Sequence, residues 1–229
     1  MTTDFNRQEL AEMQAIRWFH RIQLADGVQT PGECPHTAAE ATTRFGLPED
    51  LSGKTVLDIG AWDGLFSFEA ERRGARVTAI DTDVKNGGNW AGTRGFNFAR
   101  RKLASRVEFQ PLSVYDLDPA RHGKFDCVFF FGVLYHLTNP IEALRRVAAV
   151  TRECCLIETA YCEHPDGLKL GLWEFAHGRD NDPTNYWYPT MRGLANALKL
   201  VGFNVADVIH AQHGRMTVRA EFQRTQLPS

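Results

Sequence analysis

The middle of the chain alternates short apolar runs with segments whose apolar side chains recur at helical spacing. The apolar runs predict strands with buried centres, at 55–59, 76–80, 106–110, 125–131 and 154–158. The amphipathic segments predict helices, over 65–73, near 90–102 and from Pro140 to residue 150. Because strands alternate with helices, the pattern predicts an α/β fold with a doubly wound, mostly parallel sheet.

The two ends of the chain depart from this alternation. Apolar positions over residues 6–19 predict an amphipathic first helix, and residues 20–50 predict a loop-rich cap with one short helix. Near the other end, a helix over 190–201 precedes a predicted hairpin of two strands, 203–210 and 216–222, whose last strand is antiparallel. We therefore expect a cap at 1–50 and a main domain at 51–229, with an irregular, aromatic-rich lid insertion at about 160–189.

The composition is that of an ordinary globular protein. Hydrophobic residues make up 43% of the 229 residues and the formal net charge is −2, without the basic excess of a dedicated nucleic-acid binder. The five cysteines include no CxxC pair, which favours reduced thiols and a cytoplasmic location. The apolar run from Cys127 to Tyr135 is too short to cross a bilayer, and MTTDFNRQEL lacks the pattern of a secretory signal. We expect no metal site, since His210 and His213 lack a third ligand.

A glycine turn after the first predicted strand of the sheet carries the strongest chemical signal. Gly60 and Gly64 bracket the turn GAWDG, where the backbone can approach a ligand closely. Asp81 follows Gly60 by 21 residues, a spacing at which an acidic side chain holds ribose hydroxyls in such sheets. The turn is not the GxGxxG of dehydrogenases, and the sequence has no GxxxxGK[ST] phosphate loop. The alternatives are a plain tight turn for the glycines, and a helix N-cap or a solvated strand end for Asp81.

These features resemble the class I S-adenosylmethionine-dependent methyltransferases over about residues 50–222. The resemblance rests on DIGAWDG at 58–64, on Asp81, on DCVFFFGVLYH at 126–136 and on the C-terminal hairpin. Within that class, DGVQTPGE (26–33), GVLYHLTNP (132–140) and NYWYP (185–189) resemble the tRNA wobble-uridine methyltransferase-like group. The resemblance implies a Rossmann-like methyltransferase domain at 51–229 and S-adenosyl-L-methionine as the cofactor.

The resemblance also implies a set of cofactor-binding residues at the strand ends. The set is Asp58, Gly60, Trp62, Gly64, Asp81, Ser113, Val114, Phe131 and Gly132. The resemblance implies that the glycine loop, ordered by Asp58, faces the methionine part of the cofactor together with Phe131 and Gly132. Asp81 would hold the ribose, and residues 113–114 would flank the adenine. Trp62 departs from the family pattern, where glycine is common, so its indole either contacts a ligand or only packs.

The acceptor of the methyl group is expected beyond the carboxyl end of the 125–131 strand. An oxygen acceptor must lose its proton, and His136 is the candidate base, with Tyr135 beside it as a wall of the pocket. His136 could instead position the acceptor or hold its own loop. Four aromatic residues are candidates for closing over the acceptor: Trp18, Trp173, Trp187 and Tyr188. Such aromatics suit a planar or sugar-like acceptor, or they cap the apolar edge of the sheet.

Three functions fit this sequence. The first is O-methylation of a small-molecule or sugar hydroxyl, and N- or C-methylation stays open. The second is tRNA wobble-uridine (carboxy)methylation, but clustered basic residues are few, and Arg72–Arg73 and Arg100–Lys102 suit solvated helix faces. The resemblance implies that an enzyme using carboxy-S-adenosylmethionine holds the extra carboxylate with basic residues. Residues 17–35 contain no lysine that matches them, which favours the ordinary cofactor. The third is a non-catalytic homologue, which the retained cofactor motif disfavours. The sequence leaves the oligomeric state open.

Overall fold

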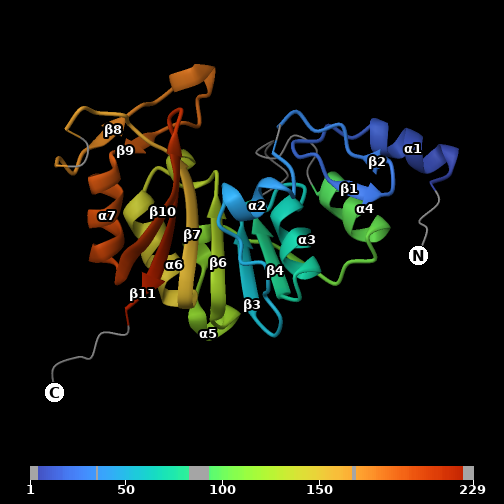
Figure 1. Ribbon diagram of the computed structural model, residues 1–229, viewed down its shortest axis with the longest axis horizontal. Helices are drawn as coiled ribbons and strands as arrows, with labels where there is room; N and C mark the ends of the chain where they lie inside the picture. The colour runs from blue at the N-terminus through green and yellow to red at the C-terminus, as the bar shows by residue number, and fades with distance from the viewer. Residues whose placement is uncertain (1–4, 35, 83–92, 167–168, 224–229) are drawn as a thin grey trace. The chain divides into compact units, whose positions relative to one another are not determined.

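A computed structural model describes residues 5–34, 36–82, 93–166 and 169–223 of the chain. Its main sheet has seven strands in the order β10-β11-β7-β6-β3-β4-β5 (Figure 1). The pairs β3–β4, β4–β5 and β6–β7 are parallel, whereas β11 runs antiparallel to both β7 and β10. The predicted fold class, a mostly parallel Rossmann-like sheet with an antiparallel C-terminal strand, is confirmed.

The elements of the chain group into two compact units, Met1–Thr42 with Pro48–Ser113, and Thr43–Leu47 with Val114–Ser229. The first unit holds α1 (Arg7–Gln14), β1 (Gln23–Ala25), β2 (Val28–Gln29), most of α2 (Glu40–Thr43), β3 (Thr55–Ile59), α3 (Leu65–Arg72), β4 (Arg76–Asp81), α4 (Arg94–Lys102) and β5 (Glu108–Pro111). The second holds η2 (Val114–Asp116), α5 (Pro119–His122), β6 (Phe125–Phe131), η3 (Leu134–His136), α6 (Pro140–Val150), β7 (Thr151–Ala160), β8 (Trp173–Phe175), η4 (Arg179–Asn181), β9 (Trp187–Pro189), α7 (Met191–Leu200), β10 (Phe203–Gln212) and β11 (Arg215–Phe222). These units are not the predicted cap at 1–50 and main domain at 51–229, and that predicted boundary stays a prediction.

The core of the first unit is built from β3, β4 and the aromatic side chains of α3 and α4. Gly64 precedes α3 with a φ of 96°, and a Cβ at this position would lie 2.5 Å from the ring of Phe68. Glycine is therefore required there by both conformation and space. Phe96 of α4 packs against Phe68 and Phe109, with ring centroids 5.1 and 4.9 Å apart. Residues 90–92 of the predicted 90–102 helix lie outside the described residues, and α4 accounts for the rest.

The N-terminal helix is shorter than predicted. A capping box between Asn6 and Glu9 begins α1, which ends at Gln14 rather than Phe19. The chain turns away after this point because Trp18 is buried in the core of the unit, where its Nε1 donates to the carbonyl of Met13 at 2.8 Å. The lead-in also contains the β1–β2 hairpin, where a loop was expected, together with the short helix α2.

The second unit is organised around β6 and β7. Phe129 and Phe130 of β6 are fully buried, as expected for a strand covered on both faces. α6 begins at Pro140, and the side chain of Asn139 caps it by accepting from the Glu142 amide at 3.2 Å. β7 is longer than the predicted 154–158 because β11 pairs with it as far as Ala160. The predicted C-terminal hairpin is present as β10–β11.

The segment 160–189 contains more regular structure than predicted. β8 and β9 form an antiparallel pair in which Trp173 lies opposite Pro189 and Phe175 opposite Trp187. The short 3-10 helix η4 lies between them, and the Tyr186 amide donates to the Tyr135 carbonyl at 2.8 Å. The prediction of an irregular segment was wrong on this point, because two three-residue strands are too short to give a clear periodicity.

Candidate active site

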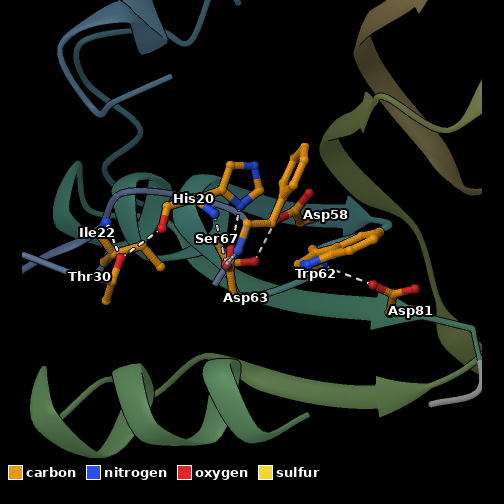
Figure 2. A network of polar contacts seen from close by, with 9 residues as sticks. His20, Ile22, Thr30, Asp58, Trp62, Asp63, Ser67 and Asp81 are labelled. Carbon is orange, nitrogen blue, oxygen red and sulfur yellow. Dashed lines mark hydrogen bonds and ion pairs between the residues drawn. The ribbon is translucent and has the colours of Figure 1, made fainter. Parts of the chain in front are cut away.

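The glycine turn after β3 is anchored to the end of β4. The Trp62 amide donates to Asp81 Oδ2 at 2.8 Å (Figure 2). Trp62 has a φ of 53°, in the left-handed region that favours glycine. The turn therefore keeps the backbone bend that a glycine would adopt, although the residue is tryptophan. The indole packs against Phe19, with ring centroids 5.0 Å apart.

Asp81 is a largely buried carboxylate, and its environment suits hydrogen bonds from hydroxyl groups. Burial raises its pKa to about 6, although the amides of Trp62 and Thr82 act in the opposite direction. Hydroxyl groups donating to this carboxylate would compensate for its lost hydration. The residues present thus fit the ribose of S-adenosylmethionine, which carries two adjacent hydroxyls.

Asp58 fastens β3 to α3 beneath the turn. Its Oδ2 accepts from Ser67 Oγ at 2.5 Å, and the side chain of Ser67 is fully buried. Burial raises the pKa of Asp58 to about 6, and the Ser67 hydrogen bond and the charge of His20 partly oppose the rise. This position agrees with the loop-ordering role that the sequence suggests for Asp58, a role that stays a proposal.

Asp63, which precedes Gly64 in the turn, binds the N-terminal segment, a role that the sequence pattern did not predict. Its Oδ2 accepts from the amides of Phe19 and His20 at 2.8 and 2.9 Å, and its Oδ1 bonds to His20 Nδ1 (Figure 2). Asp63 and His20 are 3% and 7% exposed. A carboxylate inside the glycine turn was visible in the sequence. Its partner His20 lies 43 residues earlier, so no local pattern joins the two residues.

Trp18 lies in the core of the first unit rather than at a surface. It is 1% exposed, and its ring meets Phe98 edge-on with centroids 6.0 Å apart. This environment favours the packing role over the substrate role.

The carboxyl end of β6 belongs to the second unit. Phe131 is buried, and Gly132 has a φ of 70° with open space where a Cβ would lie. The Gly132 amide donates to the Glu158 carbonyl at 3.0 Å. In the predicted adenine pair, Ser113 is half-buried at the end of the first unit and Val114 is buried at the start of the second.

Tyr135 packs against an ion pair in the second unit. The Arg215 guanidinium lies 4.6 Å from the centre of the Tyr135 ring and donates twice to the Glu158 carboxylate, at 2.7 Å each. Burial raises the pKa of the Tyr135 phenol, so the hydroxyl is protonated near neutral pH. Tyr135 therefore offers a fixed aromatic ring with one polar atom, its hydroxyl oxygen.

His136 directly follows Tyr135 at the end of η3. Its Nδ1 lies 2.9 Å from Thr184 Oγ1 and 3.1 Å from the Thr184 carbonyl. Burial lowers the pKa of His136, and the nearby negative charge of Asp182 partly opposes this effect. The imidazole is therefore neutral near neutral pH, with one ring nitrogen already engaged.

The aromatic candidates of the 160–189 segment lie on the β8–β9 hairpin. Trp187 packs on Phe175 at 4.9 Å between centroids, and its Nε1 donates to the Thr138 carbonyl at 3.3 Å. Tyr188 is buried and meets Tyr135 edge-on at 6.1 Å. Trp173 is half-buried at the start of β8. The hairpin therefore brings Tyr188 to Tyr135, whereas Trp187 contacts the loop after η3.

The described part of the chain contains no group of three or more His, Cys, Asp or Glu side chains placed to hold a metal ion. None of its helices combines the length and the apolar character needed to cross a membrane.

A family model described as a methyltransferase domain matches residues 32–208. A tRNA U34 carboxymethyltransferase from Campylobacter hominis is 28% identical over 163 residues, which cover 70% of this chain and 54% of the relative. A ubiquinone biosynthesis O-methyltransferase from Xanthomonas campestris pv. campestris is 29% identical over 155 residues, which cover 66% and 59%. The chain spans about half the length of the curated relatives it matches.

Solved structures share the fold. The N-terminal domain of EvdMO1 with SAH bound matches with a TM-score of 0.70 at 18% identity, over 97% of this chain and 99% of that one. A second structure of that domain was obtained in the presence of SAH and D-fucose. Magnesium protoporphyrin IX methyltransferase from Synechocystis PCC 6803 with bound SAM matches with a TM-score of 0.56 at 15% identity, over 76% and 72% of the two chains. The chain belongs to the methyltransferase domain family, and its fold is that of the class I methyltransferases.

Proposed function

We propose that the chain transfers the methyl group of S-adenosylmethionine to a hydroxyl of a small molecule or a sugar, with His136 as the general base. The observation that carries this proposal is the state of His136. Its lowered pKa keeps the ring neutral near neutral pH, and Nδ1 is occupied by Thr184. A neutral imidazole with one nitrogen held is suited to taking a proton from an oxygen acceptor.

The cofactor supplies a methyl group bound to a positively charged sulfur, so the protein mainly has to position the reactants and exclude water. In the proposed reaction the acceptor O–H bond breaks and its proton moves to His136. The oxygen then forms the new bond to the methyl carbon, and the electron pair of the broken S–C bond stays on sulfur. Asp81 would hold the ribose, and the rest of the predicted set would line the cofactor: Asp58, Gly60, Trp62, Gly64, Ser113, Val114, Phe131 and Gly132.

The acceptor class rests on the aromatic character of the second unit. Tyr135 and Trp187 are half-buried and offer flat apolar faces, with the buried Tyr188 packed behind Tyr135, and such faces suit sugars and planar rings. The EvdMO1 structure obtained with D-fucose is compatible with a sugar acceptor in this fold. The ubiquinone O-methyltransferase relative is compatible with a small hydroxylated ring.

A tRNA acceptor is the second candidate, favoured by the names of several relatives. The charges of the described residues speak against it. Two cations of the basic cluster of α4 are already paired with carboxylates, Arg101 with Glu12 and Lys102 with Glu9, both at 2.8 Å. Phosphate binding needs cations that are not already paired with carboxylates.

Calorimetry with S-adenosylmethionine and S-adenosylhomocysteine is the first test, and micromolar binding of both is expected. The protein is then incubated with methyl-labelled cofactor and either a panel of hydroxylated sugars and phenols or unmodified tRNA. Label in the hydroxyl panel that disappears in His136→Gln supports the proposal. Label in tRNA alone rejects the small-molecule acceptor.

A further inference from the structure

The side chains around His136 form a hydrogen-bonded chain that begins at a carboxylate. Thr184 Oγ1 lies 2.6 Å from Asp182 Oδ1 and 2.9 Å from His136 Nδ1. The Thr184 amide also donates to Asp182 Oδ1, at 2.8 Å. All of these atoms belong to the second unit, and the loop that carries residues 182–184 precedes β9.

The proton of each group in this chain can be assigned. Burial acts to raise the pKa of Asp182, but the hydrogen bonds from the hydroxyl and amide of Thr184 oppose it, and the pKa is lowered. Asp182 is therefore a carboxylate, which can only accept hydrogen bonds. The single proton of the Thr184 hydroxyl points to Asp182, so the Thr184 oxygen must accept from the histidine.

The backbone carbonyl of Thr184, the second neighbour of His136 Nδ1, also requires Nδ1 to be the donor. The Thr184 carbonyl, 3.1 Å from Nδ1, has no proton to give. Both atoms in front of Nδ1 are therefore acceptors, and Nδ1 must carry the hydrogen. In a neutral imidazole this leaves the lone pair on Nε2.

We infer that Asp182 and Thr184 are positioning residues that hold His136 in the tautomer whose Nε2 accepts the proton of the acceptor hydroxyl. This inference rests on the proposed function. When Nε2 gains the proton, the ring becomes a cation, and its Nδ1–H is already aimed at an oxygen that Asp182 polarises. The same logic of an oriented base applies in hydrolases, where a carboxylate holds a histidine.

The charges that face His136 come from three elements. Asp182 comes from the loop before β9, Glu158 from β7 and Arg215 from β11. Glu158 and Arg215 neutralise each other through their paired hydrogen bonds. The negative charge of Asp182 is therefore the one that a single substitution removes without breaking another ion pair.

The tautomer can be measured without cofactor or acceptor. Protein labelled with nitrogen-15 in histidine is studied by long-range proton–nitrogen NMR, and the His136 signal is assigned by its loss in His136→Gln. In the wild-type protein at a pH where the ring is neutral, Nδ1 is expected to carry the hydrogen. A hydrogen on Nε2 instead would overturn the inference.

Substitutions then test the two positioning residues. Thr184→Val should shift His136 toward a mixture of tautomers, and Thr184→Ser should restore the wild-type spectrum. Asp182→Asn should lower the pKa of His136, because the attractive charge is lost. Asp180→Asn is the matched control, since Asp180 Oδ2 accepts from the Tyr188 hydroxyl at 3.2 Å and does not touch His136. An unchanged tautomer in Thr184→Val, or an equal pKa shift in both Asp variants, would contradict the inference.

Activity separates this inference from the proposed function. If an acceptor hydroxyl is methylated, Thr184→Val should lower kcat at least tenfold with KM nearly unchanged, and Thr184→Ser should recover most of it. If the wild-type tautomer is as expected but no hydroxyl is methylated, the proposed function fails and the assignment of the tautomer stands.

Discussion

Asp63 binds His20 from inside the glycine turn, so the loop that follows β3 also holds the N-terminal segment in place. The carboxylate accepts from two backbone amides and from the imidazole Nδ1. Since His20 Nδ1 donates to a carboxylate, the ring orientation is fixed in the same way as that of a histidine in a catalytic dyad. The first unit thus ties residues 19–20 to the loop expected to face the cofactor.

Asp63→Ala should destabilise the protein by about 2–4 kcal/mol, because two buried amides and an imidazole would lose their acceptor. Urea unfolding followed by tryptophan fluorescence measures the change. Glu49→Ala, which removes an exposed carboxylate, is the control and should lie within about 0.5 kcal/mol of wild type. Equal midpoints for the two variants would show that the Asp63 contacts add nothing to stability.

Cofactor affinity should depend on the ionisation of Asp81. Its pKa of about 6 means that the free protein loses this charge as the pH falls through 6, and a protonated carboxyl accepts fewer hydroxyl donors. Calorimetric Kd values for S-adenosylhomocysteine should therefore weaken between pH 7.5 and pH 5. Asp81→Asn should cost about 1–3 kcal/mol at pH 7.5 and remove most of this pH dependence. A pH dependence that persists in Asp81→Asn would assign it to another group.

Asp58 should make the cofactor-free protein relatively more stable in mild acid. Its pKa is raised from 3.8 to about 6, so the folded state binds a proton more tightly than the unfolded state. The contribution of this group to stability therefore improves as the pH falls from above 6 toward 4. Asp58→Asn should lose that improvement, on the order of 1–3 kcal/mol. The comparison is the difference between wild type and variant at pH 7.5 and pH 5, because groups with lowered pKa act in the opposite direction. A variant whose stability changes with pH as much as the wild type would contradict it.

Much of the fold could be predicted because local patterns determine it. The run FDCVFFF has no polar break except Asp126, and only a strand covered on both faces explains it. The prediction of where the first helix ends was wrong because a non-local contact determines that end. Ile16 and Phe19 continue the helical spacing, but the burial of Trp18 pulls the chain out of the helix. A tertiary contact there outweighs a local periodicity.

Features of the candidate site that depend on nearby residues in the sequence could be predicted, whereas contacts between distant segments could not. The loop expected to face the cofactor follows β3 and Asp81 ends β4, so fold class and spacing suffice to place both at the ends of neighbouring strands. Contacts such as His20 with Asp63 and His136 with Thr184 join loops 43 and 48 residues apart. Loop side chains carry no periodicity, so only the structure reveals these pairs.

His136→Gln should lower kcat by about 100-fold or more and leave the cofactor Kd near its wild-type value. Because the pKa of His136 is below its ordinary value, the acid limb of the wild-type kcat profile should lie below the usual pKa of a free histidine. The limb should disappear in the variant. His122→Gln is the control, since His122 lies on α5 and bonds only to the Asp118 backbone among the described contacts. Wild-type turnover in His136→Gln would reject the base.

Trp187 and Trp18 should respond to truncation in opposite ways, because one is half-buried on the β8–β9 hairpin and the other lies in the core. Trp187→Ala should raise the KM for whichever hydroxyl compound the wild type methylates, with a stability loss below that of Trp18→Ala. Trp18→Ala should cost about 3–5 kcal/mol of unfolding free energy, the range for a large aromatic removed from a core. Urea unfolding and steady-state kinetics on both variants separate the two roles. If Trp187→Ala leaves KM unaltered, only packing against Phe175 and Thr138 explains that side chain.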